Sequence, residues 1–446
     1  MDYLTFFLCC AYKCTIIVED LYLRMKGRFI MSNYSPLAFV EKLSFVRYGG
    51  TPAEKKAADM ILADVEAAGG KGELMPFQIA ASTYTSHVTK VIAPYELEIA
   101  TVPFGMCGNV PAPGKDLKFF YAEEGTPRDF LGKDDLSDTV VMVNAVTLDV
   151  YKELCKRNAA AIFAIMGKYY HNNDEAGMYS RNLRPKFLEQ GVIPTFYINA
   201  HDATELVRNG AEMIHIELEQ TDGEATSHDV ISVIEGTEKP DEVIVLTGHF
   251  DSLPVGPGAW DNATGSAALM GLYHYFLENA PKRTLYFVWC GTEEQGLLGS
   301  KAFIEQHAEL VEKNIKFCFN FDMCGTVLGP NNIMITGDKN LEDFVDAFCR
   351  EVGYSARTRV GVHSSDSAPF ADKGIPGIGL SRGTKTSEIH TCRDTMFPLG
   401  EEALKANICF AAQMISRVAN SVILPVDTGM PESIKKELDK YFQRTK

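Results

Sequence analysis

The chain has 446 residues, of which 46% are hydrophobic and 23% are charged, and its formal net charge at pH 7 is −16. This length predicts two domains, or one domain with a large insertion, and the composition is that of an ordinary globular protein. The acidic balance argues against nucleic acid or an anionic membrane surface as a partner, and no apolar run is long enough to predict a membrane-spanning helix.

The cysteines and the N-terminal residues both bear on the cellular compartment. The eleven cysteines are odd in number and lack tight framework spacing, and several lie inside apolar runs such as Phe317-Cys318-Phe319. This pattern is typical of a reducing compartment, so we expect a cytoplasmic protein. Residues 1–30 begin with an apolar stretch that no basic residue precedes and no clear cleavage site follows. We expect an extension outside the fold that precedes a start at Met31, and secretion stays open as the alternative.

The globular pattern begins at Ser35, and its elements follow in chain order. Ser35 and Thr51, each followed by proline, predict the starts of two helices, the second of which stops at Gly69-Gly70. From about Thr83 to His228, strands at 88–93, 97–102 and 139–143 accompany apolar segments at 159–166 and 193–198 and helices at 149–157 and 202–209. After His228 we expect strands at 230–235, 243–247, 284–290, 315–321, 333–336 and 377–381, and helices at 265–279, 298–313, 341–352, 401–422 and 431–444.

This order of elements predicts an α/β fold with an insertion. Buried apolar strands that alternate with helices are typical of a mixed, mainly parallel sheet sandwiched by helices. The Pro-, Gly- and Asp-rich strands of the middle region predict a separate, β-rich inserted domain of ordinary size. We assign residues 31–90 and 226–446 to the main domain and residues 91–225 to the insertion.

Residues of metal-ligand type follow the ends of four predicted strands of the main domain. The carboxyl ends of parallel strands share one edge of a sheet, so side chains distant in sequence can meet there. Imidazoles and carboxylates suit zinc, and one carboxylate can bridge two ions about 3.5–4 Å apart. Two histidines, two outer carboxylates and one bridging carboxylate would hold such a pair and leave one glutamate as a base. The residues are His249, Asp261, Glu293, Glu294, Asp322 and His390.

Each of these signals is ordinary when it is taken alone. A single histidine at a strand end is usually held by hydrogen bonds, and a Glu-Glu pair usually marks a solvated turn. The combination favours a metal site, because all of the residues lie beyond apolar strands. The isolated histidines of the insertion, which are His87, His171, His201 and His215, are expected to be surface or core residues.

Several short segments resemble the two-zinc aminopeptidases related to bacterial leucyl aminopeptidase and glutamate carboxypeptidase II. They stand in the order of that family and read Gly248-His249-Phe250-Asp251, Asp261-Asn262-Ala263-Thr264-Gly265, Glu293-Glu294-Gln295-Gly296, Asn320-Phe321-Asp322, Ser365-Asp366-Ser367 and Ile389-His390. The resemblance covers about residues 35–85 and 228–422 and implies the zinc exopeptidase fold. The insertion is similar, more weakly, to the protease-associated domain of many family members.

The resemblance implies a role for each site residue. His249 and Asp322 would hold one zinc ion, Glu294 and His390 the other, and Asp261 would bridge the two. Glu293 would be the general base, and Asp251 would orient His249 from behind. The family also implies a cis peptide bond after the bridging aspartate, at Asp261–Asn262.

Two positions depart from the family pattern. Ser367 stands where many relatives have histidine, and Trp260 stands where an acidic residue or asparagine is commoner. His363 could replace the missing imidazole, although an ordinary loop histidine is the simpler interpretation. Neither departure falls on a metal ligand, so they bear on the choice of substrate and leave the chemistry intact.

The sequence therefore predicts a zinc-dependent exopeptidase, specifically an aminopeptidase that releases N-terminal residues from peptides with two zinc ions per chain. Three alternatives stay open. One is a glutaminyl-cyclase-like activity. Another is a carboxypeptidase, which would need arginines to anchor the substrate terminus, with Arg382 and Arg393 as candidates. The last is a non-catalytic member of the clan, against which the retention of all the ligands and the base argues.

Overall fold

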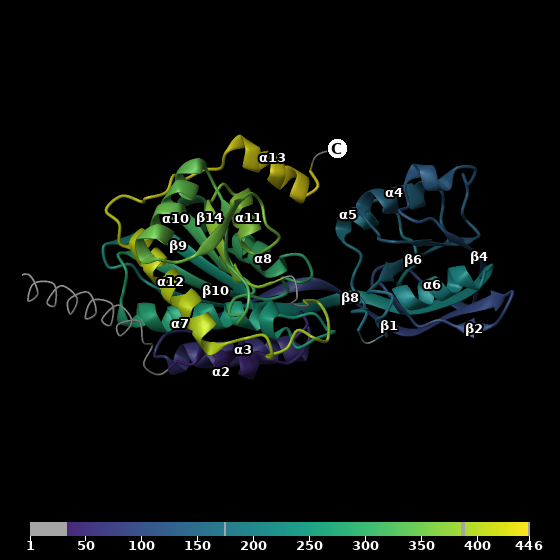
Figure 1. The fold of residues 1–446 in the computed structure, drawn as a ribbon, viewed down its shortest axis with the longest axis horizontal. Helices are drawn as coiled ribbons and strands as arrows, with labels where there is room; N and C mark the ends of the chain where they lie inside the picture. The colour runs from purple at the N-terminus through teal and green to yellow at the C-terminus, as the bar shows by residue number, and fades with distance from the viewer. Residues whose placement is uncertain (1–33, 174, 385–388, 445–446) are drawn as a thin grey trace, which may run out of the picture.

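The computed structural model describes residues 34–173, 175–384 and 389–444, so the extension expected at residues 1–30 lies outside the described residues. Figure 1 shows two lobes joined by a pair of long strands, β1 (Gly72–Ala93) and β8 (Met213–Ile234). The two strands pair antiparallel along nearly their whole length, from Gly72 opposite Ser232 to Ala93 opposite Met213. The predicted domain boundaries at 90/91 and 225/226 fall within this ladder, because the same two strands serve both lobes.

The sheet of the larger lobe carries the strands predicted after His228. From the outer edge inward its order is β13 (Ala356–Val360), β12 (Asn331–Thr336), β14 (Gly377–Arg382), β11 (Ile315–Phe321), β9 (Lys239–His249), β10 (Arg283–Cys290) and β8. The four strands β14, β11, β9 and β10 are parallel to one another, whereas β12 and β8 pair antiparallel with their neighbours β14 and β10. The mixed, mainly parallel sheet expected from the sequence is therefore present.

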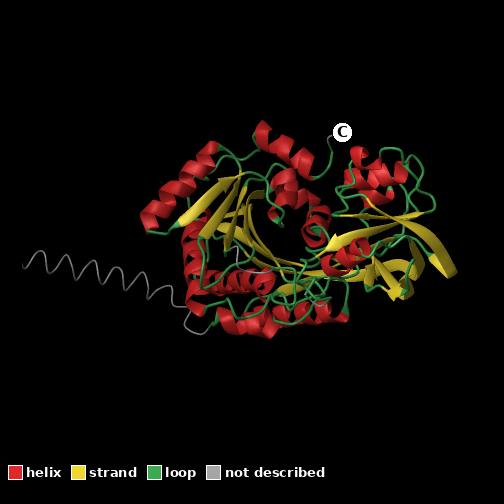
Figure 2. Ribbon diagram, turned by 45° about the vertical axis from the view of Figure 1, so that its right-hand side comes forward, coloured by secondary structure: helices red, strands yellow, loops and turns green. Residues whose placement is uncertain are grey.

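Helices cover both faces of this sheet (Figure 2). Apolar side chains of one helix set pack with the sheet in the main core, and these helices are α2 (Pro36–Leu43), α3 (Pro52–Ala67), α7 (Thr264–Glu278), α10 (Lys339–Val352) and α12 (Glu401–Ala419). The opposite face packs against α8 (Leu298–Gln306), α9 (Ala308–Lys313) and α11 (Ser367–Asp372), and α13 (Glu432–Tyr441) packs outside α11. No helix in the described ranges is both long and apolar enough to cross a membrane.

The predicted helix starts at Ser35 and Thr51 are confirmed. The Ser35 side chain accepts a hydrogen bond from the backbone N–H of Ala38, at 3.2 Å, and Thr51 Oγ1 accepts one from the N–H of Glu54, at 3.3 Å. Each cap satisfies an amide that has no partner inside its helix. The second helix ends at Ala67, just before Gly69, whose φ of 90° suits glycine.

The smaller lobe has its own apolar core, formed by buried residues between Val91 and Leu218. Its short strands are β2 (Leu97–Glu98), β3 (Thr101–Pro103), β4 (Val110–Tyr121), β5 (Thr139–Val143), β6 (Ala161–Met166) and β7 (Thr195–Asn199). Its helical segments are η1 (Pro127–Phe130), α4 (Leu148–Lys156), α5 (Pro185–Leu188) and α6 (Ala200–Arg208). The insertion is rich in strands, as the sequence predicted, and its strands β4, β5, β6 and β7 run parallel and alternate with short helices.

Three differences from the predicted elements have local physical causes. β4 was not predicted, since its Pro111, Pro113 and Gly114 read as breakers, and they fall where the register with β8 shifts. β13 is a largely polar edge strand that shows no buried apolar run. The helix predicted at 298–313 is divided at His307, whose φ of −113° and ψ of 34° leave the helical region.

A carboxylate is buried where α3 meets β8. Glu54 accepts hydrogen bonds from the Ser227 hydroxyl, at 2.8 Å, and from the backbone N–H of His228, at 3.2 Å, while its Oε2 atom has no hydrogen-bond partner. Burial outweighs these hydrogen bonds and raises the pKa of Glu54 to about 7. A raised acid pKa in the folded state means that ionisation of Glu54 destabilises the fold.

We predict that Glu54→Gln weakens the pH dependence of stability. The penalty in the native chain is absent below about pH 4.5, grows as pH rises, and is complete above about pH 7. At about 1.4 kcal/mol per pKa unit, the penalty amounts to roughly 3 kcal/mol. Thermal unfolding of both proteins between pH 5 and pH 8 checks this, because the melting temperature of the native chain should fall more steeply. Parallel curves would contradict it.

Candidate metal centre

Four strand ends of the larger lobe meet at one edge of its sheet. β9 ends at His249, and Asp322 directly follows β11. Beyond β10, Thr292 has a φ of 52°, a left-handed conformation that turns the chain just before Glu293 and Glu294. His390 lies beyond β14 and has a φ of 59° itself. Residues separated by up to 141 positions along the chain therefore reach one site, as expected from parallel strands.

Asp261 is held in η2 (Ala259–Ala263), an irregular turn that leads into α7. Its peptide bond to Asn262 is cis, as the family resemblance implies. The carboxylate of Asp394 accepts hydrogen bonds from the backbone N–H groups of Trp260, at 2.7 Å, and Asp261, at 3.0 Å. These contacts fix the backbone from which the Asp261 side chain projects.

The side chain of Asn262 ties the same turn to the end of β11. Its Nδ2 donates to the carbonyl of Phe321, at 2.8 Å, and its Oδ1 accepts from the N–H groups of Gly265, at 2.8 Å, and Met323, at 3.0 Å. A Cβ atom at position 265 would lie 2.2 Å from the Phe321 carbonyl oxygen, so glycine is required there. The Asp261-Asn262-Ala263-Thr264-Gly265 segment thus has a structural reason for its asparagine and glycine.

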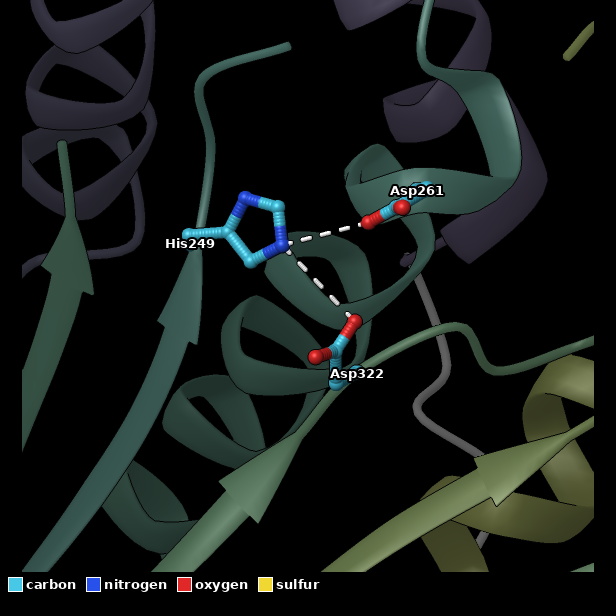
Figure 3. Close-up of side chains that lie close together, drawn as sticks. All are labelled: His249, Asp261 and Asp322. Carbon is cyan, nitrogen blue, oxygen red and sulfur yellow. Dashed lines mark ion pairs between the residues drawn. The ribbon is translucent and has the colours of Figure 1, made fainter. Parts of the chain in front are cut away.

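The two carboxylate oxygens of Asp261 point to different histidines. Oδ1 lies 3.2 Å from His249 Nε2, and Oδ2 lies 3.1 Å from His390 Nε2. Asp322 Oδ1 lies 3.7 Å from His249 Nε2, and Glu294 Oε2 lies 3.3 Å from His390 Nε2. Figure 3 shows the first group, in which His249 faces Asp261 and Asp322.

Two groups of possible metal ligands result, and they share Asp261. His249, Asp261 and Asp322 form one, while Asp261, Glu294 and His390 form the other, and in each the ligand atoms lie within 4.8 Å of one another. Within the described ranges of the chain, these are the groups of three or more such residues that could hold an ion. The structure thus brings together all five residues that the sequence predicted as metal ligands.

The ligand atoms of the two groups are not all satisfied by hydrogen bonds among themselves, and their chemistry suits divalent cations. Asp322 Oδ1 is buried without a hydrogen-bond partner. Burial alone would lower the pKa of His390, but hydrogen bonds and charges from Asp261 and Glu294 raise it to about 11. The surrounding carboxylates likewise raise the pKa of His249 well above its usual range against the effect of burial. The site therefore demands positive charge at the imidazole Nε2 atoms, which metal ions bound to neutral imidazoles would supply.

Glu293 lies beside these groups without belonging to either. Its Oε2 is 3.9 Å from His249 Nε2. Burial raises the pKa of Glu293 well above its usual range, and the charges of Asp366, Glu294 and Asp322 add to the rise although His249 opposes it. A buried carboxylate with a raised pKa is suited to accept and return a proton.

Asp251 supports both the first histidine and the two glutamates. Its fully buried carboxylate lies 3.3 Å from His249 Nδ1 and accepts hydrogen bonds from the backbone N–H groups of Glu293, at 2.9 Å, and Glu294, at 3.3 Å. The contact with Nδ1 directs the other imidazole nitrogen, Nε2, toward Asp261 and Asp322. Asp251 thus lies next to His249 on the side away from the ligand groups, where the family resemblance places a residue that orients this histidine.

Three residues that support the site were not assigned a role from the sequence. Ser365 donates to Asp322 Oδ2, at 2.7 Å, and its position in a family motif was the available signal. Asp394 and Arg47 gave no signal, because their partners are backbone atoms. The Arg47 guanidinium is buried, and it donates to carbonyls of the loop before η2, among them Gly258 at 2.7 Å, while burial lowers its pKa to about 10.

The histidines of the insertion lie away from both groups. His87 Nε2 contacts the Thr101 carbonyl at 2.9 Å, and His215 lies 2.6 Å from Asp116 and 3.2 Å from Glu217. We predict that single alanine substitutions at His87, His171, His201 and His215 leave metal content unchanged, because none contributes to the ligand groups. Metal analysis of each purified variant, with His249→Ala as the positive control, checks this. Loss of metal from one of the four would show that its histidine serves the site.

A cleft of about 610 Å³ opens onto the site. Its floor carries the site residues His249, Asp261, Glu293, Glu294, Asp322 and His390. The insertion lines it with Tyr179, Arg181, Arg184, Pro185 and Lys186, and the C-terminal end lines it with Tyr441, Phe442 and Gln443. Such a volume lies within the range of about 300–1,000 Å³ that is typical of small-ligand sites.

An α/β sheet with two carboxylate-bridged ligand groups and an adjacent buried glutamate defines the class of metal-dependent hydrolases. Residues 229–415 match the model of Peptidase family M28. This match, together with the aminopeptidase relatives described next, confirms the predicted assignment as a metallo-aminopeptidase.

Known relatives share most of the chain at low sequence identity. Aminopeptidase YwaD of Bacillus subtilis is 22% identical over 432 residues, which cover 91% of this chain and 87% of that protein. The aminopeptidase of Aneurinibacillus sp. strain AM-1 superimposes with a TM-score of 0.72 at 21% identity and covers 92% of this chain and 100% of that one. The zinc aminopeptidase BSAP of Bacillus subtilis superimposes with a TM-score of 0.72 at 20% identity and covers 90% of this chain and 98% of that one. These structures confirm the predicted fold class.

Proposed function

We propose that this chain is a zinc-dependent aminopeptidase that holds two metal ions. The observation that carries the proposal is the position of Asp261, which directs one oxygen to His249 and the other to His390. Asp322 completes the first set of ligands and Glu294 the second. Zinc ions in such a pair supply Lewis-acid chemistry, since they polarise a carbonyl and lower the pKa of water.

The protein groups around the metals then perform the proton transfers. Glu293 takes a proton from the attacking water and returns it to the leaving amine, a role that its burial and raised pKa support. Asp251 holds His249 through Nδ1 and keeps the backbone of Glu293 and Glu294 in place. Ser365 holds one oxygen of Asp322 and leaves the other free for a metal.

The shape and charge of the cleft support removal of residues from the amino end of a peptide. Glu293 lies outside both ligand groups, so its carboxylate would keep negative charge on the floor beside bound metal ions and attract a free α-ammonium group, which an internal peptide bond lacks. The insertion and the C-terminal residues both line the cleft beside the site residues, and a cleft enclosed by several parts of the chain favours chain ends over the middle of a polypeptide. We also propose that residues 91–225 form a protease-associated-like domain that controls access, since residues 179–186 line the cleft.

One alternative is a carboxypeptidase, in which Arg382 or Arg393 would anchor the C-terminal carboxylate of the substrate. Arg382 donates to the Thr326 carbonyl, at 2.6 Å, and to Asn331 Oδ1, at 2.9 Å, and Arg393 pairs with Glu175 of the insertion. Neither arginine is among the residues that line the cleft. These two candidate anchors are therefore engaged elsewhere, whereas other arginines, Arg181 and Arg184, do line the cleft, so substrate tests must separate the two activities.

Turnover of a matched peptide set tests the proposal. We expect hydrolysis of amino-acid amides and of peptides with a free amino end, and no hydrolysis of the same peptides after N-acetylation. Preferential cleavage of N-acetylated peptides at their carboxyl end would establish the carboxypeptidase instead. Conversion of N-terminal glutamine to pyroglutamate, with one metal ion per chain, would establish the cyclase-like alternative.

A further inference from the structure

A group of cations lines the same cleft as the acidic site residues. The cationic side chains among the lining residues, apart from the site histidines, are Arg181, Arg184, Lys186 and Lys301. Three come from the insertion, whereas Lys301 belongs to α8 of the catalytic lobe. The insertion and the larger lobe thus both contribute positive charge to the cleft.

Three of these cations have no ion pair with a carboxylate among the described residues. Lys301 Nζ donates to the carbonyl of Gly296, at 2.8 Å, and Arg181 lies 5.4 Å from the centre of the Phe104 ring. Arg184 is exposed and makes no ion pair in the part of the chain that the structure describes, whereas Lys186 lies 3.7 Å from Glu189. Burial, and next the charge of Arg184, lowers the pKa of Lys301, so Arg184 and Lys301 repel each other across the cleft.

The acidic residues that line the cleft do not relieve this repulsion. Among the described lining residues they are Asp261, Glu293, Glu294 and Asp322, which belong to the site itself. Bound metal ions would neutralise the ligand carboxylates and leave the positive charge of Arg181, Arg184 and Lys301 without compensation. Uncompensated like charges that face a cavity are stabilised by an anionic ligand.

We propose that Arg181, Arg184 and Lys301 bind the C-terminal carboxylate of short peptide substrates, of two or three residues. This inference rests on the proposed function. In an aminopeptidase, the free α-ammonium of the substrate lies at the acidic floor, so the carboxylate of a short peptide extends on the leaving side of the scissile bond toward the cations. The limited volume of the cleft, about 610 Å³, fits a ligand of that length.

Peptides that differ in one charge test the proposal. We compare hydrolysis of Leu-Gly, Leu-Gly amide and Leu-Glu amide by the native protein loaded with zinc and by Arg184→Gln and Lys301→Gln. Both residues keep much of their surface exposed and belong to no apolar core, although the Lys301 amine is partly desolvated, so their loss leaves the core intact. Arg128→Gln, an exposed arginine of the insertion away from the cleft, is the matched control.

The native protein should hydrolyse Leu-Gly about 10- to 100-fold more efficiently, in kcat/KM, than its amide, because an ionic hydrogen bond is lost with the charge. Arg184→Gln and Lys301→Gln should reduce this preference at least severalfold, mainly through KM, and leave the amide rate near the native value. Arg128→Gln should change neither rate. The preference should also fall with added salt, because the cations are partly exposed.

If Leu-Glu amide replaces Leu-Gly as the preferred substrate, the cations bind a side-chain carboxylate and the C-terminal assignment is wrong. Equal efficiency for free acid and amide, with no change in the variants, would overturn the proposal while hydrolysis of the amide upheld the aminopeptidase. Failure to hydrolyse any of the three by zinc-loaded protein would instead overturn the proposed function.

Discussion

Replacement of Glu293 by glutamine should lower kcat about 10²- to 10⁴-fold while both metal ions remain bound. The substitution keeps the shape of the side chain and removes the oxygen that accepts the proton. Glu293 lies outside both ligand groups, so metal affinity should be nearly unchanged. Steady-state kinetics on an amino-acid amide, together with metal analysis of the same preparation, measures both quantities.

The neighbouring residue supplies the matched control. Glu294→Gln makes the same chemical change one position later, but Glu294 lies 3.3 Å from His390 within a ligand group. It should therefore weaken metal binding, and excess zinc should restore part of its activity. If Glu293→Gln keeps near-native kcat, or loses metal while Glu294→Gln does not, the two roles have been assigned to the wrong residues.

Removal of metal should abolish hydrolysis and also lower the stability of the fold. Without metal ions the carboxylates Asp261, Glu293, Glu294 and Asp322 lie close together and depend on the charge of His249 and His390. Ligand binding to the native state stabilises it by about 4 kcal/mol per site when free metal is 1,000 times Kd. Chelation should therefore lower the melting temperature, and zinc should restore both activity and stability.

The metal content of the active protein provides the quantitative check. Two ions per chain are expected, because Asp261 offers a separate oxygen to each histidine. His249→Ala should lose one ion more readily than the other, since it disrupts a single group. Fully active protein with one ion per chain would contradict the shared role of Asp261.

Much of the site could be predicted because local chemistry encodes it. The uninterrupted apolar runs Val243–Leu246 and Phe317–Phe319 do not alternate with polar residues, so they were expected to be central strands of a covered sheet. Parallel strands place their carboxyl ends at one edge, and for that reason ligand types at these ends could be grouped without coordinates. The helix caps at Ser35 and Thr51 could also be predicted from the sequence, because each cap hydrogen bond joins residues only three positions apart.

Other features had no local signal. β13 and β4 owe their existence to neighbours in the sheet rather than to an apolar pattern of their own, and the break at His307 interrupts an otherwise helical sequence. Asp394 and Arg47 serve the site through backbone groups more than 100 residues away. Side chains that bind distant backbone atoms leave no spacing that a sequence could reveal.

The sequence by itself therefore determined the α/β sheet and the ligand types at its edge, while the roles of Glu293 as base and Glu294 as ligand were implied by the family resemblance. Only the tertiary structure decided which oxygen of Asp261 faces which histidine, and which residues form the walls of the cleft. The reason is the range of the interactions involved. Strand burial, helix caps and turns depend on neighbours along the chain, whereas the presence of Arg184 and Lys301 in one cleft depends on how the insertion and the larger lobe meet in three dimensions.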